Sequence, residues 1–202
     1  RGFAKLTVAG RSRYGNAAAP FEGGYDIKSV KIISTIGGKQ TETVVEPEIT
    51  DTRMRVDLPK LLKAGGDKVV VKVDYSYTVP EYGADRTGIL KNADGNIYAI
   101  AQWYPRICVF DDIQGWNTLP YLGASEFYLE YGNFDVSITA PASHVVVASG
   151  DLLNPSEVMT AEQLKRYQKA HQSDETVMIR SKEEIKNPSS RPSVAKLTWK
   201  YS

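Results

Sequence analysis

Alternation of apolar and polar side chains is the feature that most limits how this chain can fold. Between residues 69 and 79 the apolar side chains recur at every second position: Val69, Val71, Val73, Tyr75, Tyr77 and Val79. Successive side chains of a strand point to opposite faces of its sheet. The pattern therefore predicts a β-strand with one buried face and one face in water.

Similar but shorter patterns predict further strands along the chain. We expect them at Phe3 to Val8, Tyr25 to Ile36, Thr41 to Val45, Arg53 to Leu58, Phe127 to Tyr131, Phe134 to Ile138, His144 to Ser149, Thr176 to Arg180, and Leu197 to Tyr201. Gly37-Gly38 fits a hairpin turn. Pro59 to Leu62 fits a brief helical turn, and Gly132-Asn133 either a bulge or a tight turn.

Many short strands with little helix favour an all-β fold, an antiparallel β-sandwich built as one domain over residues 1–202. One short helix is expected near residues 160–172. Thr160 can cap it, with Gln163 in the capping-box position, and Leu164, Tyr167 and His171 form one stripe along it. Residues 182–192 are charged and then rich in Pro and Ser, which predicts an exposed loop after at most one helical turn.

Charge and composition restrict the classes of partner. The chain has 25 Lys and Arg against 24 Asp and Glu, a net charge of +1, which gives no electrostatic case for binding nucleic acid. No apolar run approaches the ~20 residues of a transmembrane helix, so no transmembrane segment is expected. The single cysteine, Cys108, cannot form an internal disulfide and fits a buried apolar position.

A complete catalytic set cannot be assembled from this sequence. The two histidines, His144 and His171, are far apart and form no H-E-x-x-H motif, so no metal site is predicted. There is no G-x-S-x-G elbow and no phosphate loop. Adjacent carboxylates such as Asp111-Asp112 point to opposite faces in a strand, which favours a solvated or loop-capping role over an acid/base pair. No catalytic residue is predicted.

One stretch between two strand-like segments is unusually rich in aromatic and charged residues. It comprises Gln102-Trp103-Tyr104-Pro105-Arg106, then Phe110-Asp111-Asp112 and Gly115-Trp116-Asn117. Loops positioned by a rigid scaffold commonly carry function. We expect Arg106 to pair with Asp111 or Asp112 and so to hold the loop, and Trp103 and Trp116 to serve packing or an interface.

These motifs, together with residues 126–136, Ser149 to Pro155 and Leu197 to Lys200, resemble the amino-terminal domain of aminopeptidase N-type zinc metallopeptidases. The resemblance is strongest for a subgroup found in secreted or periplasmic bacterial proteins, and it covers roughly Val69 to the end. It implies a saddle-shaped β-sandwich and a periplasmic, secreted or cell-surface location. The strand that runs into Ser202 suggests a piece of a longer protein.

The same resemblance implies a division of labour. The zinc and its ligands would belong to a catalytic domain expected after Ser202, so this chain would hold no cofactor and would have no peptidase activity alone. Gln102 would accept hydrogen bonds from the free α-amino group of a peptide substrate, and Tyr104 would line the pocket for the first side chain. The alternative is a carbohydrate- or protein-binding β-sandwich module in which Trp103, Tyr104 and Trp116 form a stacking platform.

Overall fold

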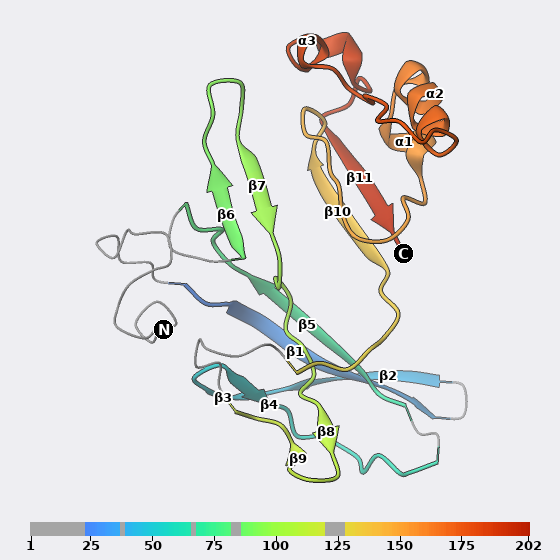
Figure 1. Cartoon of the computed structure of the whole chain (residues 1–202). Coiled ribbons are helices and arrows are strands. Elements are labelled where there is room, and N and C mark those ends of the chain that lie inside the picture. The colour runs from blue at the N-terminus through green and yellow to red at the C-terminus, as the bar shows by residue number, and fades with distance from the viewer. Residues whose placement is uncertain (1–22, 37–38, 66–67, 82–85, 120–127) are drawn as a thin grey trace. The chain divides into compact units, whose positions relative to one another are not determined.

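The computed structural model describes residues 23–36, 39–65, 68–81, 86–119 and 128–202 (Figure 1). The fold is all-β, with antiparallel strand pairs and few helices, as the sequence predicted. The predicted strand at Phe3 to Val8 lies outside the described residues, and so does the turn at Gly37-Gly38. The sandwich and its saddle shape stay predictions.

The chain divides into two compact units, Arg1–Glu130 and Tyr131–Ser202. Each unit is described by itself below. The prediction of a single domain over residues 1–202 stays a prediction.

A three-stranded antiparallel sheet forms the centre of the first unit. Its order is β2 (Lys39–Val45), β1 (Asp26–Ile36), β5 (Val70–Ser76), with β1 in the middle (Figure 1). In this register Val30 lies opposite Val73 and Ile32 opposite Val71. Val30 and Ile32 are each only 1% exposed. The alternate positions that are apolar in the sequence therefore form the buried face of the sheet.

The other strands of this unit form short antiparallel hairpins. They are β3 (Glu48–Thr50) with β4 (Arg53–Arg55), β6 (Thr87–Leu90) with β7 (Ile97–Ile100), and β8 (Phe110–Asp111) with β9 (Gly115–Trp116). Every side chain of β7 is exposed. A two-stranded hairpin with open faces is marginal by itself in water, so these hairpins depend on their surroundings.

The second unit is built around the hairpin of β10 (Val136–Pro141) and β11 (Lys196–Tyr201). Leu197, Trp199 and Tyr201 alternate with more exposed residues and form its core with Ala142 and Val158. Beyond β11, Asp151 and Ser202 exchange two backbone hydrogen bonds, and Leu152 forms a bridge to Tyr201. The predicted strand at Leu197 to Tyr201 is confirmed.

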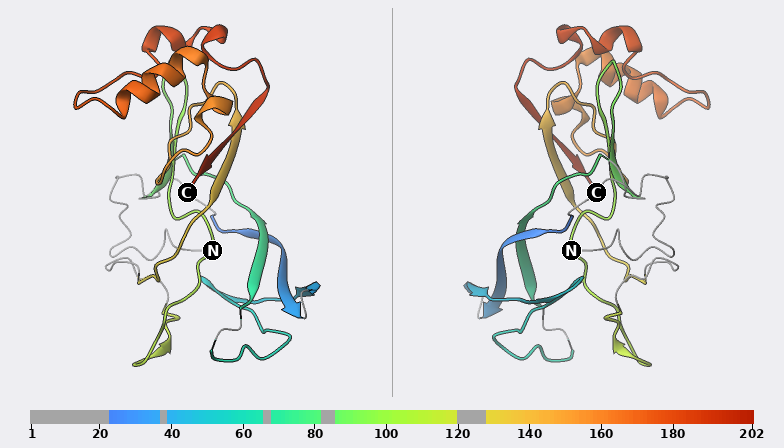
Figure 2. Two further views of the ribbon diagram at one scale, coloured as in Figure 1. Left: turned by 90° about the vertical axis from the view of Figure 1, so that its right-hand side faces the viewer. Right: turned by 90° about the vertical axis from the view of Figure 1, so that its left-hand side faces the viewer.

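Helices lie toward the end of that hairpin where β10 ends and β11 begins, in both views of Figure 2. They are α1 (Pro155–Val158), α2 (Ala161–Ala170), α3 (Lys182–Ile185) and the 3-10 turn η3 (Pro188–Ser190). The predicted helix is confirmed as α2, whose capping box joins Thr160 and Gln163 as expected. A second capping box, Ser181 with Glu184, starts α3 and went unrecognised in the sequence.

Two of the predicted strands in the second unit are wrong. From His144 to Ala148 burial does alternate, with Val145 and Val147 exposed and Val146 and Ala148 against the core, but the segment forms no ladder. Its carbonyl at Val146 instead accepts a hydrogen bond from the Tyr201 hydroxyl over 2.8 Å. At Thr176 to Arg180 the carbonyl of Ile179 likewise accepts from the Arg166 side chain. In each segment a carbonyl accepts its hydrogen bond from a side chain and not from a neighbouring strand.

Other predicted elements are shorter or missing. The strand from Arg53 ends at Arg55, and residues 59–62 form a bend at 59–60 followed by irregular chain in place of a helical turn. Residues 128–135 are all exposed and form no strand, since they have no buried face to hold one, and the later strand begins at Val136. Neither Gly132 nor Asn133 has a positive φ, so no turn or bulge of the expected kind lies there.

Candidate functional site

Two tyrosines attach the aromatic-rich loop to the central sheet of the first unit. The Tyr25 hydroxyl donates a hydrogen bond to the backbone carbonyl of Gln102 over 3.2 Å. The Tyr75 hydroxyl donates to the next carbonyl, that of Trp103, over 2.9 Å. Tyr25 immediately precedes β1 and Tyr75 is in β5, which pairs with β1, so the sheet register brings the two donors together.

The rings of these tyrosines pack into a cluster with Tyr77. The ring centroids of Tyr25 and Tyr75 are 5.0 Å apart, and those of Tyr25 and Tyr77 are 5.7 Å apart in an edge-to-face arrangement. Aromatic pairs with such geometry are stabilising beyond the area that they bury. Residues 75 and 77 share a face because strand side chains alternate. The two hydroxyl groups that bond to the loop therefore belong to side chains whose rings are packed against one another.

Partial burial raises the pKa of both phenols. It raises the pKa of Tyr75 to about 12, with smaller contributions from Tyr25 and Tyr77. Burial likewise raises the pKa of Tyr25, and Tyr77 adds to that rise while the positive charge of Arg106 opposes it. Both hydroxyls thus remain hydrogen-bond donors well above neutral pH.

Gln102 has a left-handed backbone conformation with φ of 55°. Among the described residues other than glycine only Asp51 shares a positive φ. The left-handed region costs a residue with a Cβ about 1–2 kcal/mol, and such strain persists only where surrounding contacts impose it. A hydrogen bond contributes about 0.5–1.5 kcal/mol net, so the two tyrosine bonds together can offset the strain. Gln102 is half-buried, not sealed in the core.

Trp103, Tyr104 and Arg106 form a short stack after Gln102. The rings of Trp103 and Tyr104 meet edge to face with centroids 5.3 Å apart. The guanidinium carbon of Arg106 lies 5.9 Å from the centroid of the Tyr104 ring, within the range of a cation–π contact. Tyr104 and Arg106 are half-buried, whereas Trp103 is exposed. Arg106 thus supports Tyr104, a role that the sequence did not indicate.

Asp111 holds the following turn through the backbone. Its Oδ1 accepts hydrogen bonds from the backbone N–H of Ile113 at 3.0 Å and of Gln114 at 2.7 Å. This arrangement caps the turn between β8 and β9, where Gly115 has φ of 68°. Asp112 is exposed. The predicted ion pair of Arg106 with either aspartate is not among the contacts that the structure describes.

A second aromatic pair lies on the β8–β9 hairpin. Phe110 is opposite Trp116 in the register, and their rings meet edge to face with centroids 5.2 Å apart. The two residues are 62% and 57% exposed. Cys108, predicted to be buried, is a half-buried free thiol, while its neighbour Val109 is fully buried. This hairpin therefore anchors through Val109 and leaves its aromatic pair open.

No family model, curated protein or solved structure matches this chain. The function must therefore be argued from its own residues. In the part of the chain that the structure describes, no group of three or more His, Cys, Asp or Glu is placed to hold a metal ion. His144 contacts Ser143, and His171 caps α2 against Tyr167, so the two histidines are on separate elements.

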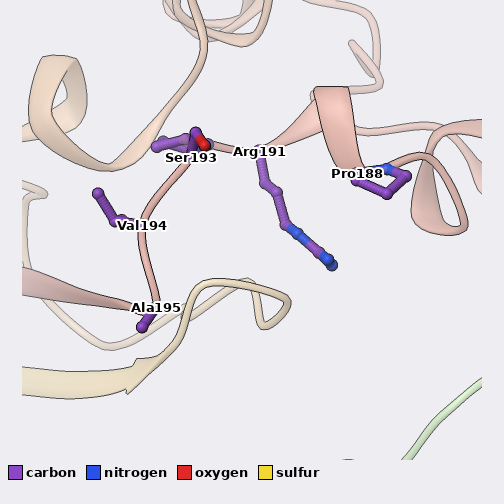
Figure 3. A pocket seen from close by; sticks show the side chains of 6 residues that line it. Pro188, Arg191, Ser193, Val194 and Ala195 are labelled. Atoms are coloured by element: carbon purple, nitrogen blue, oxygen red, sulfur yellow. The ribbon is translucent and has the colours of Figure 1, made fainter.

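A pocket in the second unit is lined by Pro188, Arg191, Pro192, Ser193, Val194 and Ala195, and Figure 3 shows the Arg191 side chain extending away from the backbone there. None of the helices in the described ranges is both long and apolar enough to cross a membrane. Of the residues predicted to form a site, Gln102, Tyr104 and Arg106 lie together, and Asp111 and Asp112 belong to the next turn.

The sequence analysis missed the tyrosines that hold this loop. Tyr75 and Tyr77 were read only as the apolar face of a strand, and Tyr25 only as a strand start. The sequence did contain a signal: the inward positions change from valine to tyrosine at residues 75 and 77. A half-buried tyrosine usually needs a hydrogen-bond partner for its hydroxyl group, which indicates that another segment lies nearby.

Proposed function

We propose that this chain is a non-catalytic, substrate-binding domain of a zinc aminopeptidase. In this proposal it helps to bind the free amino end of a peptide and packs on a catalytic domain that carries the zinc and is expected after Ser202. The proposal extends to a periplasmic, secreted or cell-surface location. It begins from the resemblance of residues 102–136 to the amino-terminal domains of such enzymes.

The observation that carries the proposal is the strained, fixed backbone of Gln102. A left-handed glutamine is uncommon, and strained backbone that surrounding contacts such as the Tyr25 bond impose is found mostly at functional sites. Its side-chain oxygen is a hydrogen-bond acceptor of the kind that an ammonium group needs. A hydrogen bond to a charged group contributes about 1.5–3 kcal/mol, which corresponds to at least tenfold discrimination for a free amine over a blocked one.

Exposed apolar side chains near the loop support packing against a further domain. Ile107 is 67% exposed and Ile113 is 87% exposed, and they flank β8. In the proposed enzyme the second domain would cover these two side chains, and the loop would border the cleft between the domains.

Binding of a free amine by this chain is the direct test. We expect alanyl-alanine amide to shift backbone amide signals of residues 101–106 in an NMR titration, and its N-acetylated form to bind at least tenfold more weakly. The Gln102→Ala variant should lose this preference. Gln114→Ala is the control, since it removes the same kind of side chain from an exposed position in the neighbouring turn.

Two results would contradict the proposal. One is equal binding of the free and acetylated peptides to the unmodified chain. The other is metal-dependent hydrolysis of amino-acid arylamides by the 202-residue chain alone, at rates that Gln102→Ala leaves unchanged. Either would assign the loop another role.

A stacking module is the second candidate, and the exposed pair of Phe110 and Trp116 favours it. An aromatic pair open to solvent can stack on the apolar face of a sugar ring or on a partner's side chain. Soluble oligosaccharides would then change the tryptophan fluorescence of the chain, and Trp116→Phe would abolish the change. If fluorescence does not respond to any oligosaccharide tested, the carbohydrate form of this candidate is rejected.

A further inference from the structure

We infer that Tyr25 and Tyr75 are positioning residues that aim the Gln102 side chain at the ligand. This inference rests on the proposed function, because it concerns the same amine-binding loop. It names two residues from outside the loop, one before β1 and one in β5, as determinants of its affinity. Neither tyrosine needs to touch the ligand.

The geometry of the two hydrogen bonds supports the inference. They end on consecutive carbonyl groups, those of Gln102 and Trp103. The carbonyl of Gln102 belongs to the peptide plane that follows its own Cα, so a hydrogen bond that holds the carbonyl oxygen opposes rotation about ψ of Gln102. Together with a φ of 55°, this restrains the direction of the Cα–Cβ bond relative to the sheet.

The two donors are themselves firmly based. Their rings touch at a centroid distance of 5.0 Å, and the strands that position them are paired in the same sheet. A site whose supporting residues are locked by packing holds its ligand groups more accurately than a site on a free loop. The hydrogen bonds from Tyr25 and Tyr75 therefore restrain the backbone at Gln102 relative to the sheet.

Removing single hydroxyl groups tests the inference. Tyr25→Phe and Tyr75→Phe keep both rings and delete only the donors. Tyr77→Phe is the matched control, because Tyr77 packs in the same cluster while its hydroxyl has no hydrogen bond to another residue in the described ranges. We expect the first two variants to bind alanyl-alanine amide about tenfold more weakly and the acetylated peptide with unchanged affinity. Tyr77→Phe should bind both as the unmodified chain does.

A second measurement separates positioning from general stability. A positive φ brings the amide and α protons of one residue close, so Gln102 should give a strong cross-peak between them that weakens in Tyr25→Phe and Tyr75→Phe. In a Gln102→Ala background the tyrosine substitutions should not lower the affinity further, because the side chain that they aim is gone.

The outcomes distinguish the inference from the function on which it rests. If the unmodified chain shows no preference for the free amine, the proposed function fails. If the preference is present and Tyr25→Phe and Tyr75→Phe retain it, the proposed function stands and the positioning role is rejected. An affinity loss that persists in the Gln102→Ala background also rejects it, because the tyrosines would then act by another route.

Discussion

The side-chain oxygen of Asn154 accepts a hydrogen bond from the backbone N–H of Lys200 over 2.9 Å. Its side-chain nitrogen donates to the carbonyl of Thr198 at 2.9 Å and to the Glu157 carboxylate at 2.7 Å. Asn154 is 6% exposed. One amide side chain thus extends the pairing of residues 151–153 with β11 and continues the ladder where the backbone leaves it for α1.

Asn154→Ala should destabilise the chain by about 1–3 kcal/mol, since it leaves a part-buried N–H and a part-buried carbonyl without their partner. Urea unfolding measures the change. Gln172→Ala, which removes an exposed amide, should cost less than about 0.5 kcal/mol. Equal stability of the two variants would show that water replaces the Asn154 bonds.

Gly150→Ala should be more damaging than Gly65→Ala, although both glycines have nearly the same φ, +89° and +92°. The backbone strain is then alike, about 1–2 kcal/mol in each. A Cβ at Gly150 would lie 2.5 Å from the backbone oxygen of Ser202, whereas at Gly65 it would meet nothing within 4 Å. The difference between their unfolding free energies reports the clash, and equal values would mean that the backbone at Ser202 moves aside freely.

The pairing of the tyrosines with the loop should weaken at high pH. The folded pKa of Tyr75 is about 12, above the value near 10 of an unfolded tyrosine. Its contribution is therefore complete below pH 10 and is lost as the pH rises from 10 to 12. Thermal unfolding between pH 9 and 12 should show this loss, and Tyr75→Phe should reduce it.

Tyr131→Phe is the control for that titration, because Tyr131 is fully exposed. It should leave both the midpoint at pH 9 and its fall toward pH 12 unchanged. If the thermal midpoint of Tyr75→Phe falls between pH 9 and 12 as steeply as that of the unmodified chain, Tyr75 is not the group responsible for the loss.

Acid should weaken the second unit through Glu184. Its carboxylate accepts hydrogen bonds from Arg166 Nη1 and from the Ser181 N–H, each at 2.7 Å, and Arg166 is the main reason that the pKa of Glu184 is lowered. A lowered folded pKa contributes stability above the ordinary carboxyl value, which is lost as the pH falls through the folded pKa. Glu184→Gln should lower the thermal midpoint at pH 7 and flatten its decline below pH 4.5, whereas the exposed Glu175→Gln should do neither.

The elements that the sequence predicted correctly are those in which local pattern and pairing agree. The alternation around Val73 and around Trp199 marks strands that do have partners, and the capping box at Thr160 marks a real helix. Alternation at Val145 and Val147 looks the same in the sequence, but the backbone there finds side-chain partners. Alternation of apolar residues indicates which face of a segment is buried, but it does not indicate which distant part of the chain supplies the hydrogen-bond partner of its backbone.

The candidate site was foreseen in part for a similar reason. Gln102, Tyr104 and Arg106 are close in the chain, so their proximity could be expected. Arg106 lies over Tyr104 and Asp111 accepts hydrogen bonds from its own turn, contacts that the charge pattern did not indicate, while the expected ion pair of Arg106 with an aspartate stays a prediction. Tyr25 and Tyr75 reach the loop through strand register over long sequence separations, which no local pattern encodes.

The strand order β2-β1-β5 has a consequence for how the chain folds. β1 and β2 are neighbours in the sequence, so their hairpin closes a short loop and should form early, whereas β5 must return from beyond β4 at a greater entropic cost. The contact between Tyr25 and Tyr75 can exist only after that return. Refolding monitored at the loop around Gln102 should therefore lag behind the appearance of hairpin structure.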